Sequence, residues 1–298
     1  MDNKCAPGVK YNDGSCLTKD NLIEIAENFP KKNIKTNVSK KELVDTLQKE
    51  FKNKYNCKDQ LCWLDQTFVK RLNNENINKF TFRPFGPNKK YDWLSTLDIN
   101  AVVEQYEKNK NDFIFLGAVP YDFQEIEPEL DNMDFDKLRN GELNENFNQG
   151  KKTNKMGMVI NLDDHTKGGS HWVSLFANFD KNQIYFFDSF AKPPGKKIKK
   201  FINKIAKYMY KNKYNKDLFV NHVIKKMKNQ ENSTSVDKLN KFDIRHNTIQ
   251  HQFNNSECGV YSINFLVRLA NGETFDDITK NILGDKFINN CRKTYFRN

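Results

Sequence analysis

The chain has 298 residues, of which 37% are hydrophobic and 13% aromatic, enough to build one large folded domain or two smaller ones. This composition excludes a wholly disordered chain, even though 29% of the residues are charged and the mean hydropathy is -0.83. The formal net charge of +11 comes mostly from lysine, which attracts phosphates but lacks the planar fork with which arginine reads bases. Non-specific attraction to polyanions is therefore expected, and sequence-specific DNA reading is not.

The sequence carries no signal for a membrane or for secretion. It contains no run of about 18 apolar residues, so we expect no transmembrane helix. The first thirty residues are acidic in places and lack an apolar core, so they do not form a secretory signal. We therefore expect a soluble protein of a reducing compartment. Its six cysteines are too few for a disulfide scaffold and match no standard zinc spacing, which predicts mainly free thiols and no metal at Cys5, Cys16, Cys57, Cys62, Cys258 and Cys291.

Residues 1–85 are predicted to form a helical, Lys-rich arm domain. Apolar residues follow a cap-like start at Thr18, and a second helix begins with the capping pattern Ser39-x-x-Glu42. An Asn-rich run over 73–90, punctuated by prolines and a glycine near its end, indicates a boundary near residue 85. We expect this arm to bind a partner protein, or nucleic acid weakly, rather than to perform chemistry.

Residues 86–298 are predicted to form the second domain, an α+β mixture. A helix is expected to end near Lys108, followed by a short apolar strand or buried loop over 113–120. Strands are then predicted over 156–162, 171–179 and 183–188, and an amphipathic helix over 196–210.

Two of these strands bring a histidine and an aspartate together. If the tight turn centres on Asp180 and Lys181, Val173 lies opposite Asp188, and His171 becomes a diagonal neighbour of Asp188 on one face. Such neighbours lie about 7 Å apart between backbones, within reach of an imidazole–carboxylate hydrogen bond. A single histidine on a strand is more often a structural residue, so the pair by itself does not indicate a catalytic site.

A cysteine stands where a helix is predicted to begin. Apolar residues spaced as one helical stripe follow Cys258, which places its side chain in the first turn of that helix. Backbone N–H groups at a helix start favour the thiolate form, which is the nucleophile. The alternative is a small buried hydrophobe, the commonest role of a free cysteine. The polar residues just before Cys258 count against that alternative.

These residues resemble the clan of cysteine proteases that contains adenain and the SUMO-specific proteases, whose catalytic groups come in the order His, Asp or Asn, Gln, Cys. The resemblance covers about 93–270 and includes a Trp-Leu entry segment at Trp93. It implies a central mixed sheet flanked by helices, and it is strongest to the polyprotein-processing proteases of large cytoplasmic DNA viruses. Such an origin implies a place in the virus factory of the host cytoplasm and in the virion. The residues that carry the resemblance are His171-Trp172, Asp188-Ser189, Gln252 and Cys258-Gly259.

The residues and the resemblance together predict a mechanism that needs no cofactor. Cys258 is expected to attack a peptide carbonyl, His171 to move the proton, and Asp188 to orient the imidazole. The Gln252 amide and the Cys258 backbone N–H are expected to bind the oxyanion. The resemblance implies that Trp172 lines a narrow groove for glycine-sized residues, so that structural precursors are cut after Gly-Gly or Ala-Gly pairs.

Several alternatives remain open from the sequence. Gln250 competes with Gln252 for the oxyanion role, and Trp172 could be an ordinary core residue. The same chemistry would serve a deconjugase that cleaves after the Gly-Gly tail of a ubiquitin-like modifier. Acyl transfer through the thioester is a second alternative function, and a decayed, non-enzymatic nucleic-acid-binding protein is a third.

Overall fold

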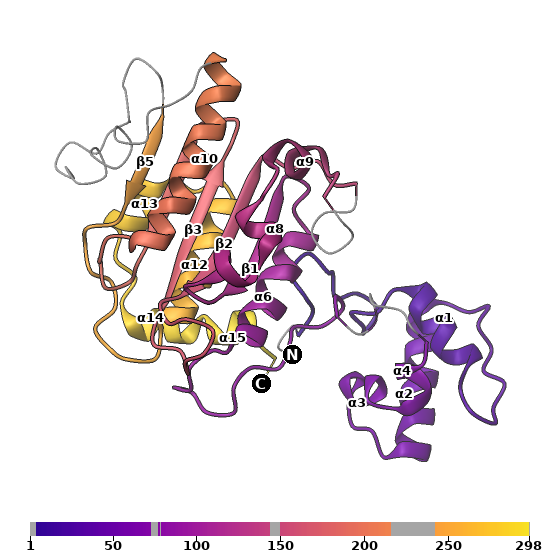
Figure 1. Cartoon of the computed structure of the whole chain (residues 1–298). Coiled ribbons are helices and arrows are strands. Elements are labelled where there is room, and N and C mark those ends of the chain that lie inside the picture. Colours follow the sequence, from indigo (N-terminus) through magenta and orange to yellow (C-terminus); the bar gives the residue numbers. More distant parts are fainter. Residues whose placement is uncertain (1–3, 73–76, 78, 144–149, 216–241, 298) are drawn as a thin grey trace. The chain divides into compact units, whose positions relative to one another are not determined.

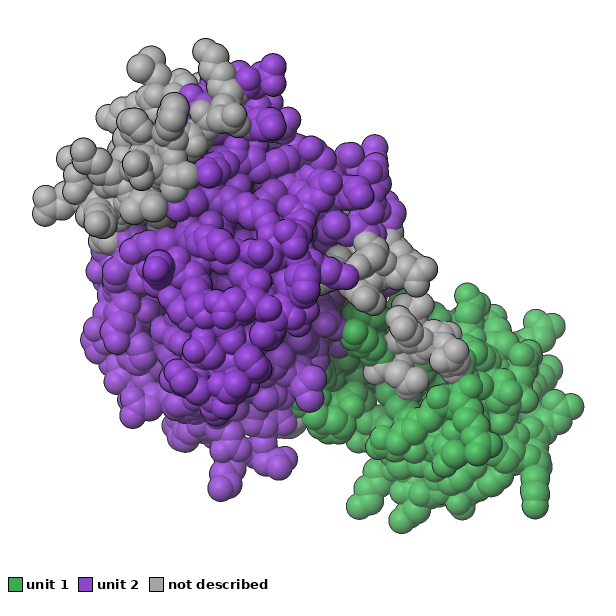
Figure 2. Space-filling model, in the orientation of Figure 1, with its two compact units in different colours: residues 1–85, 297 green, residues 86–296, 298 purple. Residues whose placement is uncertain are grey.

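A computed structural model describes residues 4–72, 77, 79–143, 150–215 and 242–297 (Figure 1). Part of the Asn-rich run noted above, at 73–76 and 78, lies outside the described residues. The chain divides into two compact units, Met1–Phe85 with Arg297 and Gly86–Phe296 with Asn298 (Figure 2). Each unit has hydrophobic core residues of its own.

The first unit is helical, as expected. The Thr18 side chain accepts the Asn21 N–H at the start of the first helix, and the Ser39 side chain accepts the Glu42 N–H at the start of the second. The core of this unit contains Phe51 and Trp63, which stack with ring centroids 4.8 Å apart. Its helices are α1 Lys19–Glu27, α2 Lys40–Tyr55, α3 Gln60–Leu64 and α4 Thr67–Lys70.

The expectation of free thiols in the first unit is wrong. Cys5 and Cys16 form one disulfide, and Cys57 and Cys62 form a second, with Cα atoms 5.5 and 5.4 Å apart. Sequence spacing gave no sign of this, because pairing depends on how turns bring Cα atoms together. No group of side chains that could hold a metal ion occurs among the described residues.

The second unit is built on a five-stranded sheet with strand order β1-β2-β3-β4-β5. The pairs β1/β2 and β4/β5 are parallel, whereas β2/β3 and β3/β4 are antiparallel. This confirms the mixed sheet that the sequence implied, and the short fifth strand is the one that was not predicted. The strands are β1 Phe113–Val119, β2 Lys155–Asn161, β3 Trp172–Asn178, β4 Gln183–Phe187 and β5 Asp243–His246.

Helices cover both faces of the sheet (Figure 1). On one face, α10 (Lys196–Tyr214) packs its apolar stripe against strand residues such as Leu175. On the other face, α6 (Thr96–Lys108) and α12 (Cys258–Ala270) pack against the alternate residues, such as Phe176. The remaining described helices of this unit are α7 Phe123–Ile126, α8 Pro128–Asp131, α9 Phe135–Asn140, α13 Phe275–Lys280, α14 Asp285–Asn290 and α15 Arg292–Tyr295.

The β3–β4 hairpin has the register predicted from its turn. Pairing starts with Asn178 opposite Gln183 and reaches Ser174 opposite Phe187. One step further along, Val173 lies opposite Asp188, so the open end of the hairpin carries Asp188 and His171. Among the described residues, no helix has the length and apolar character needed to cross a bilayer.

Candidate active site

A histidine–aspartate pair lies at the open end of the β3–β4 hairpin. His171 directly precedes β3 and Asp188 directly follows β4, and the His171 Nε2–H donates to Asp188 Oδ1 at 2.7 Å. Both residues are buried. The predicted diagonal neighbours are therefore joined by a direct hydrogen bond. The Phe190 ring lies against the imidazole, with ring centroids 4.8 Å apart.

Asp188 is held, at its carboxylate and at its backbone, by neighbours that the sequence analysis missed. The Phe190 N–H donates to Oδ1 at 2.8 Å, which uses another lone pair of the oxygen that faces His171. Asn247 accepts the Asp188 N–H at 2.9 Å and donates to the Asp188 carbonyl at 2.7 Å. Asn247 follows β5, and β5 runs parallel to β4, so both strands end at the same edge. Recognition of β5 as a parallel neighbour of β4 would have found this residue.

Cys258 is the first residue of α12 and is almost fully buried. Burial by itself would lower the pKa of His171, but hydrogen bonds to Asp188 and Cys258 outweigh it and raise that pKa to about 9. The imidazole thus carries a proton at neutral pH and lies between a carboxylate and a sulfur.

Gln252 is tied to the residue after Asp188. The Ser189 Oγ–H donates to Gln252 Oε1 at 2.6 Å, and the Gln252 backbone N–H donates to the Ser189 carbonyl at 3.0 Å. The Gln252 side-chain amide also donates to the Asn254 carbonyl at 2.7 Å, which uses one of its two N–H bonds. Gln252 is buried, whereas Gln250 is exposed and donates to the Gln252 carbonyl. The two glutamines therefore differ in burial, and the oxyanion role of Gln252 stays a prediction.

Trp172 is a buried core residue that also lines a cavity, and its role in a substrate groove stays a prediction. Its ring is buried in the core on the α12 side of the sheet, and its indole N–H donates to the Leu94 carbonyl at 2.9 Å. It also borders a cavity of about 550 Å³. Trp93, half-exposed, and Leu94 line the same cavity, together with Pro120, Asn161 and His165.

A mixed sheet packed between helices, with a cysteine at a helix start beside a histidine–aspartate pair, defines the class of cysteine peptidases. The sequence profile of the Ulp1 protease family, C-terminal catalytic domain, matches residues 133–297, and this chain belongs to that family. The predicted resemblance to SUMO-type proteases is thereby confirmed, as is the assignment as a cysteine protease that acts on proteins.

The relatives found are viral thiol proteases. A protein of Acanthamoeba polyphaga mimivirus that is named as a thiol protease is 32% identical over 99% of this chain and 94% of its own length. A cysteine protease of African swine fever virus, isolate Tick/Malawi/Lil 20-1/1983, is 22% identical over 86% of this chain and 88% of its own. A crystal structure of the African swine fever virus protease has the same fold, with a TM-score of 0.68, 19% identity and coverage of 100% of this chain and 96% of that one.

Proposed function

We propose that this protein is an endopeptidase that cleaves viral structural precursors after small residues, with Cys258, His171 and Asp188 as its catalytic triad. The observation that carries the proposal is the position of the His171 imidazole, which is hydrogen-bonded to Asp188 and to Cys258. This is the geometry that proton transfer between a nucleophile and its base requires.

The proposed reaction begins from a thiolate and an imidazolium. The Cys258 thiolate attacks the carbonyl carbon of the scissile bond and forms a tetrahedral intermediate. His171 donates its proton to the leaving amine, which departs and leaves a thioester on the sulfur. The imidazole then takes a proton from water, which attacks the thioester and releases the acid. Asp188, whose backbone is held by Asn247, accepts from Nε2 and keeps that nitrogen protonated, which leaves the other ring nitrogen to exchange the proton in the proposed reaction.

The oxyanion is proposed to lie between α12 and Gln252. The first N–H groups of a helix have no acceptor within the helix, so the Cys258 N–H is available for a substrate oxygen. The second N–H of the Gln252 amide supplies the other donor, because Ser189 fixes the amide orientation through its oxygen. Loss of one such donor costs about 3 kcal/mol of transition-state stabilisation.

The cavity beside Trp172 supports selectivity for small residues. An extended peptide that reaches Cys258 would pass between the ring of Trp172 and that of Trp93, which border the same cavity. Residues with no side-chain branch at Cβ would fit between two rings most easily, which favours Gly-Gly or Ala-Gly before the scissile bond. Trp172 would line this groove with one edge while the rest of its ring packs in the core.

A deconjugase of a ubiquitin-like modifier is the second candidate. The family match favours it, and relatives from several African swine fever virus isolates are named SUMO-1 cysteine proteases. The chemistry is the same, and only the body of the substrate differs.

Cleavage assays separate the two candidates. The full chain is incubated with fragments of structural precursors from a large DNA virus and, in parallel, with fusions that follow the Gly-Gly tail of a SUMO-type modifier. Cys258→Ala serves as the matched control for contaminating proteases. Cleavage of the precursor fragments only supports the endopeptidase, whereas efficient release of the modifier fusions alone overturns it.

The place and partners of the enzyme belong to the same proposal. An enzyme for structural precursors would work in the virus factory of the host cytoplasm and in the virion. The first unit would hold partner proteins or precursors, with weak binding of nucleic acid through its lysines. The two disulfides bear on the proposed location of the enzyme, because disulfides persist in oxidising surroundings. Their redox state in purified virions tests this placement.

A further inference from the structure

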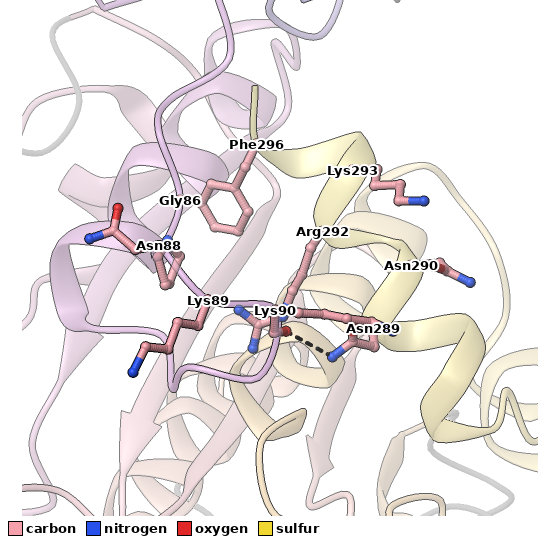
Figure 3. Close-up of a pocket in the computed structure, with 10 residues that line it drawn as sticks. Gly86, Asn88, Lys89, Lys90, Asn289, Asn290, Arg292, Lys293 and Phe296 are labelled. Carbon is pink, nitrogen blue, oxygen red and sulfur yellow. Dashed lines mark hydrogen bonds between the residues drawn. The ribbon is translucent and has the colours of Figure 1, made fainter. Parts of the chain in front are cut away.

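A basic cavity of about 330 Å³ lies between the segment 86–90 and the helices α14 and α15 (Figure 3). Four of its ten lining residues are cationic, three carry amide side chains, and none is acidic. Such a lining offers many hydrogen-bond donors and net positive charge to whatever enters. The polar residues are Lys89, Lys90, Arg292 and Lys293, with Asn88, Asn289 and Asn290.

The walls of this basic cavity are held by specific contacts. Gly86 packs against the Phe296 ring so closely that an added Cβ would lie 2.6 Å from Cγ, so the wall requires glycine. The turn that carries Lys89 and Lys90 is closed by Asp92, whose carboxylate accepts the Lys89 N–H at 3.1 Å. Asn289 donates to the Lys90 carbonyl at 3.2 Å, a contact drawn in Figure 3. Both lysines are exposed, but the backbone that presents them is fixed.

Arg292 lines the cavity and has a buried donor, Nε, that is not used by any described residue. Its exposed fraction is 9%, and its Nη2 donates to the Asp92 carbonyl at 2.7 Å and to the Ser256 carbonyl at 3.1 Å. Its Nε is buried and has no acceptor among the residues that the structure describes. Burial lowers the pKa of Arg292, although the negative charge of Glu257 opposes this. A buried guanidinium with a free donor gains from an anion that accepts from it.

We propose that the basic cavity binds a phosphate group, either of free polyphosphate or of a nucleic-acid strand. A phosphate offers several oxygens to converging donors and suits both the fork of an arginine and the point charges of lysines. The volume admits one or two linked phosphates rather than a folded partner. This inference does not rest on the proposed protease function, and binding can be measured without a substrate.

The basic cavity shares two side chains with the segment that leads to Cys258. Arg292 holds the Ser256 carbonyl, and Asn289 donates to Glu257 Oε1 at 3.1 Å. Glu257 is buried and directly precedes Cys258. A bound phosphate would therefore stabilise groups that already support the start of α12.

Titration calorimetry of the full chain with inorganic pyrophosphate at about 50 mM salt tests the proposal, because surface charges are weakly screened there. The variant is Lys89→Gln with Lys90→Gln, since both side chains are exposed and their loss leaves the fold intact. The matched control is Lys207→Gln with Lys211→Gln, two exposed lysines on α10 that remove the same charge. We expect the Kd to weaken about tenfold or more in the first variant and to stay within about twofold in the control.

Three outcomes decide the matter. No binding of pyrophosphate or of a short single-stranded oligonucleotide at millimolar concentration overturns the site. Equal weakening in both double variants overturns it as well, because the attraction would then be general to the surface. Weakening confined to Lys89→Gln with Lys90→Gln supports it, and the probe that binds, pyrophosphate or oligonucleotide, identifies the source of the phosphate.

Discussion

At the residue scale, the proposed site depends on the His171 imidazole, which interacts with both Asp188 and Cys258. If Cys258 and His171 act as a unit, Cys258→Ala and His171→Ala should each reduce kcat at least about a thousandfold. The double variant should lose no more than the worse single variant. Cys258→Ala removes only a sulfur atom, so the free energy of unfolding should stay within about 1 kcal/mol. Kinetics of all three variants on one peptide measure this, and additive losses would show that the two residues act separately.

The raised pKa of His171 predicts the pH dependence of cleavage. The imidazole normally titrates near 6.5, but here it keeps its proton up to a pH of about 9. Because the protonated form donates to the leaving amine, kcat/KM should stay level as the pH passes 6.5 and fall as it rises through about 9.

The variant Asp188→Asn checks the cause of this shift. An amide cannot offset the imidazolium charge, so the alkaline limb of the pH profile should move to lower pH. A pH profile of kcat/KM for both enzymes measures the effect. A limb near 6.5 in the unchanged enzyme would contradict the assigned role of His171.

At the scale of elements, the start of α12 is fitted closely to the segment that enters the second unit. A Cβ added at Gly259 would lie 3.0 Å from Leu94 Cβ, so Leu94 must shift by a few tenths of an ångström. The Leu94 carbonyl accepts the indole N–H of Trp172. A shift of Leu94 would therefore move Trp172, which lines the proposed substrate groove.

Gly259→Ala should therefore lower kcat/KM about tenfold while changing the free energy of unfolding by about 1 kcal/mol, because improved helix propensity offsets the crowding. Gly284→Ala is the control, since a Cβ there meets no atom within 4 Å. Peptide kinetics and thermal melting of both variants give the comparison. A fully active Gly259→Ala enzyme would mean that the groove does not depend on Leu94.

The elements show what a single sequence could and could not predict. The hairpin register followed from its turn, because a two-residue turn fixes every pair in an antiparallel ladder. β5 was missed because it is four residues long and pairs with a strand more than fifty residues away. Asn247 was missed with it. Local patterns thus predicted His171 and Asp188 as neighbours, and the family resemblance added Cys258, whereas the pairing of β4 with β5 had to come from the structure.

At the scale of the whole molecule, the described cysteines divide by unit. The four paired cysteines lie in the first unit, and the free ones, Cys258 and Cys291, lie in the second. The denatured, unreduced chain should therefore take up two iodoacetamide groups, and the reduced chain six. Mass spectrometry of intact protein counts them, and six adducts without a reductant would contradict the disulfides.

Iodoacetamide labelling of the native chain, with the labelled cysteine identified by mass spectrometry, distinguishes the two free thiols. Burial raises the pKa of Cys291, which disfavours its reactive thiolate, whereas Cys258 is the nucleophile of the proposed mechanism. At a pH near 6, Cys258 should therefore react first.

Loop-closure entropy predicts that each disulfide, with sequence separations of 11 and 5, stabilises the first unit by about 2–3 kcal/mol.

This division gives the two units opposite chemical requirements. An oxidant preserves the cross-links of the first unit but can convert the sulfur of Cys258 to a sulfenic acid, which no longer attacks a carbonyl. A strong reductant protects Cys258 and, at the same time, opens the loops that close the first unit. A preparation with full peptide turnover can therefore contain a weakened N-terminal unit. With the role proposed for the first unit, activity on short peptides and engagement of large substrates should respond in opposite directions to the thiol buffer.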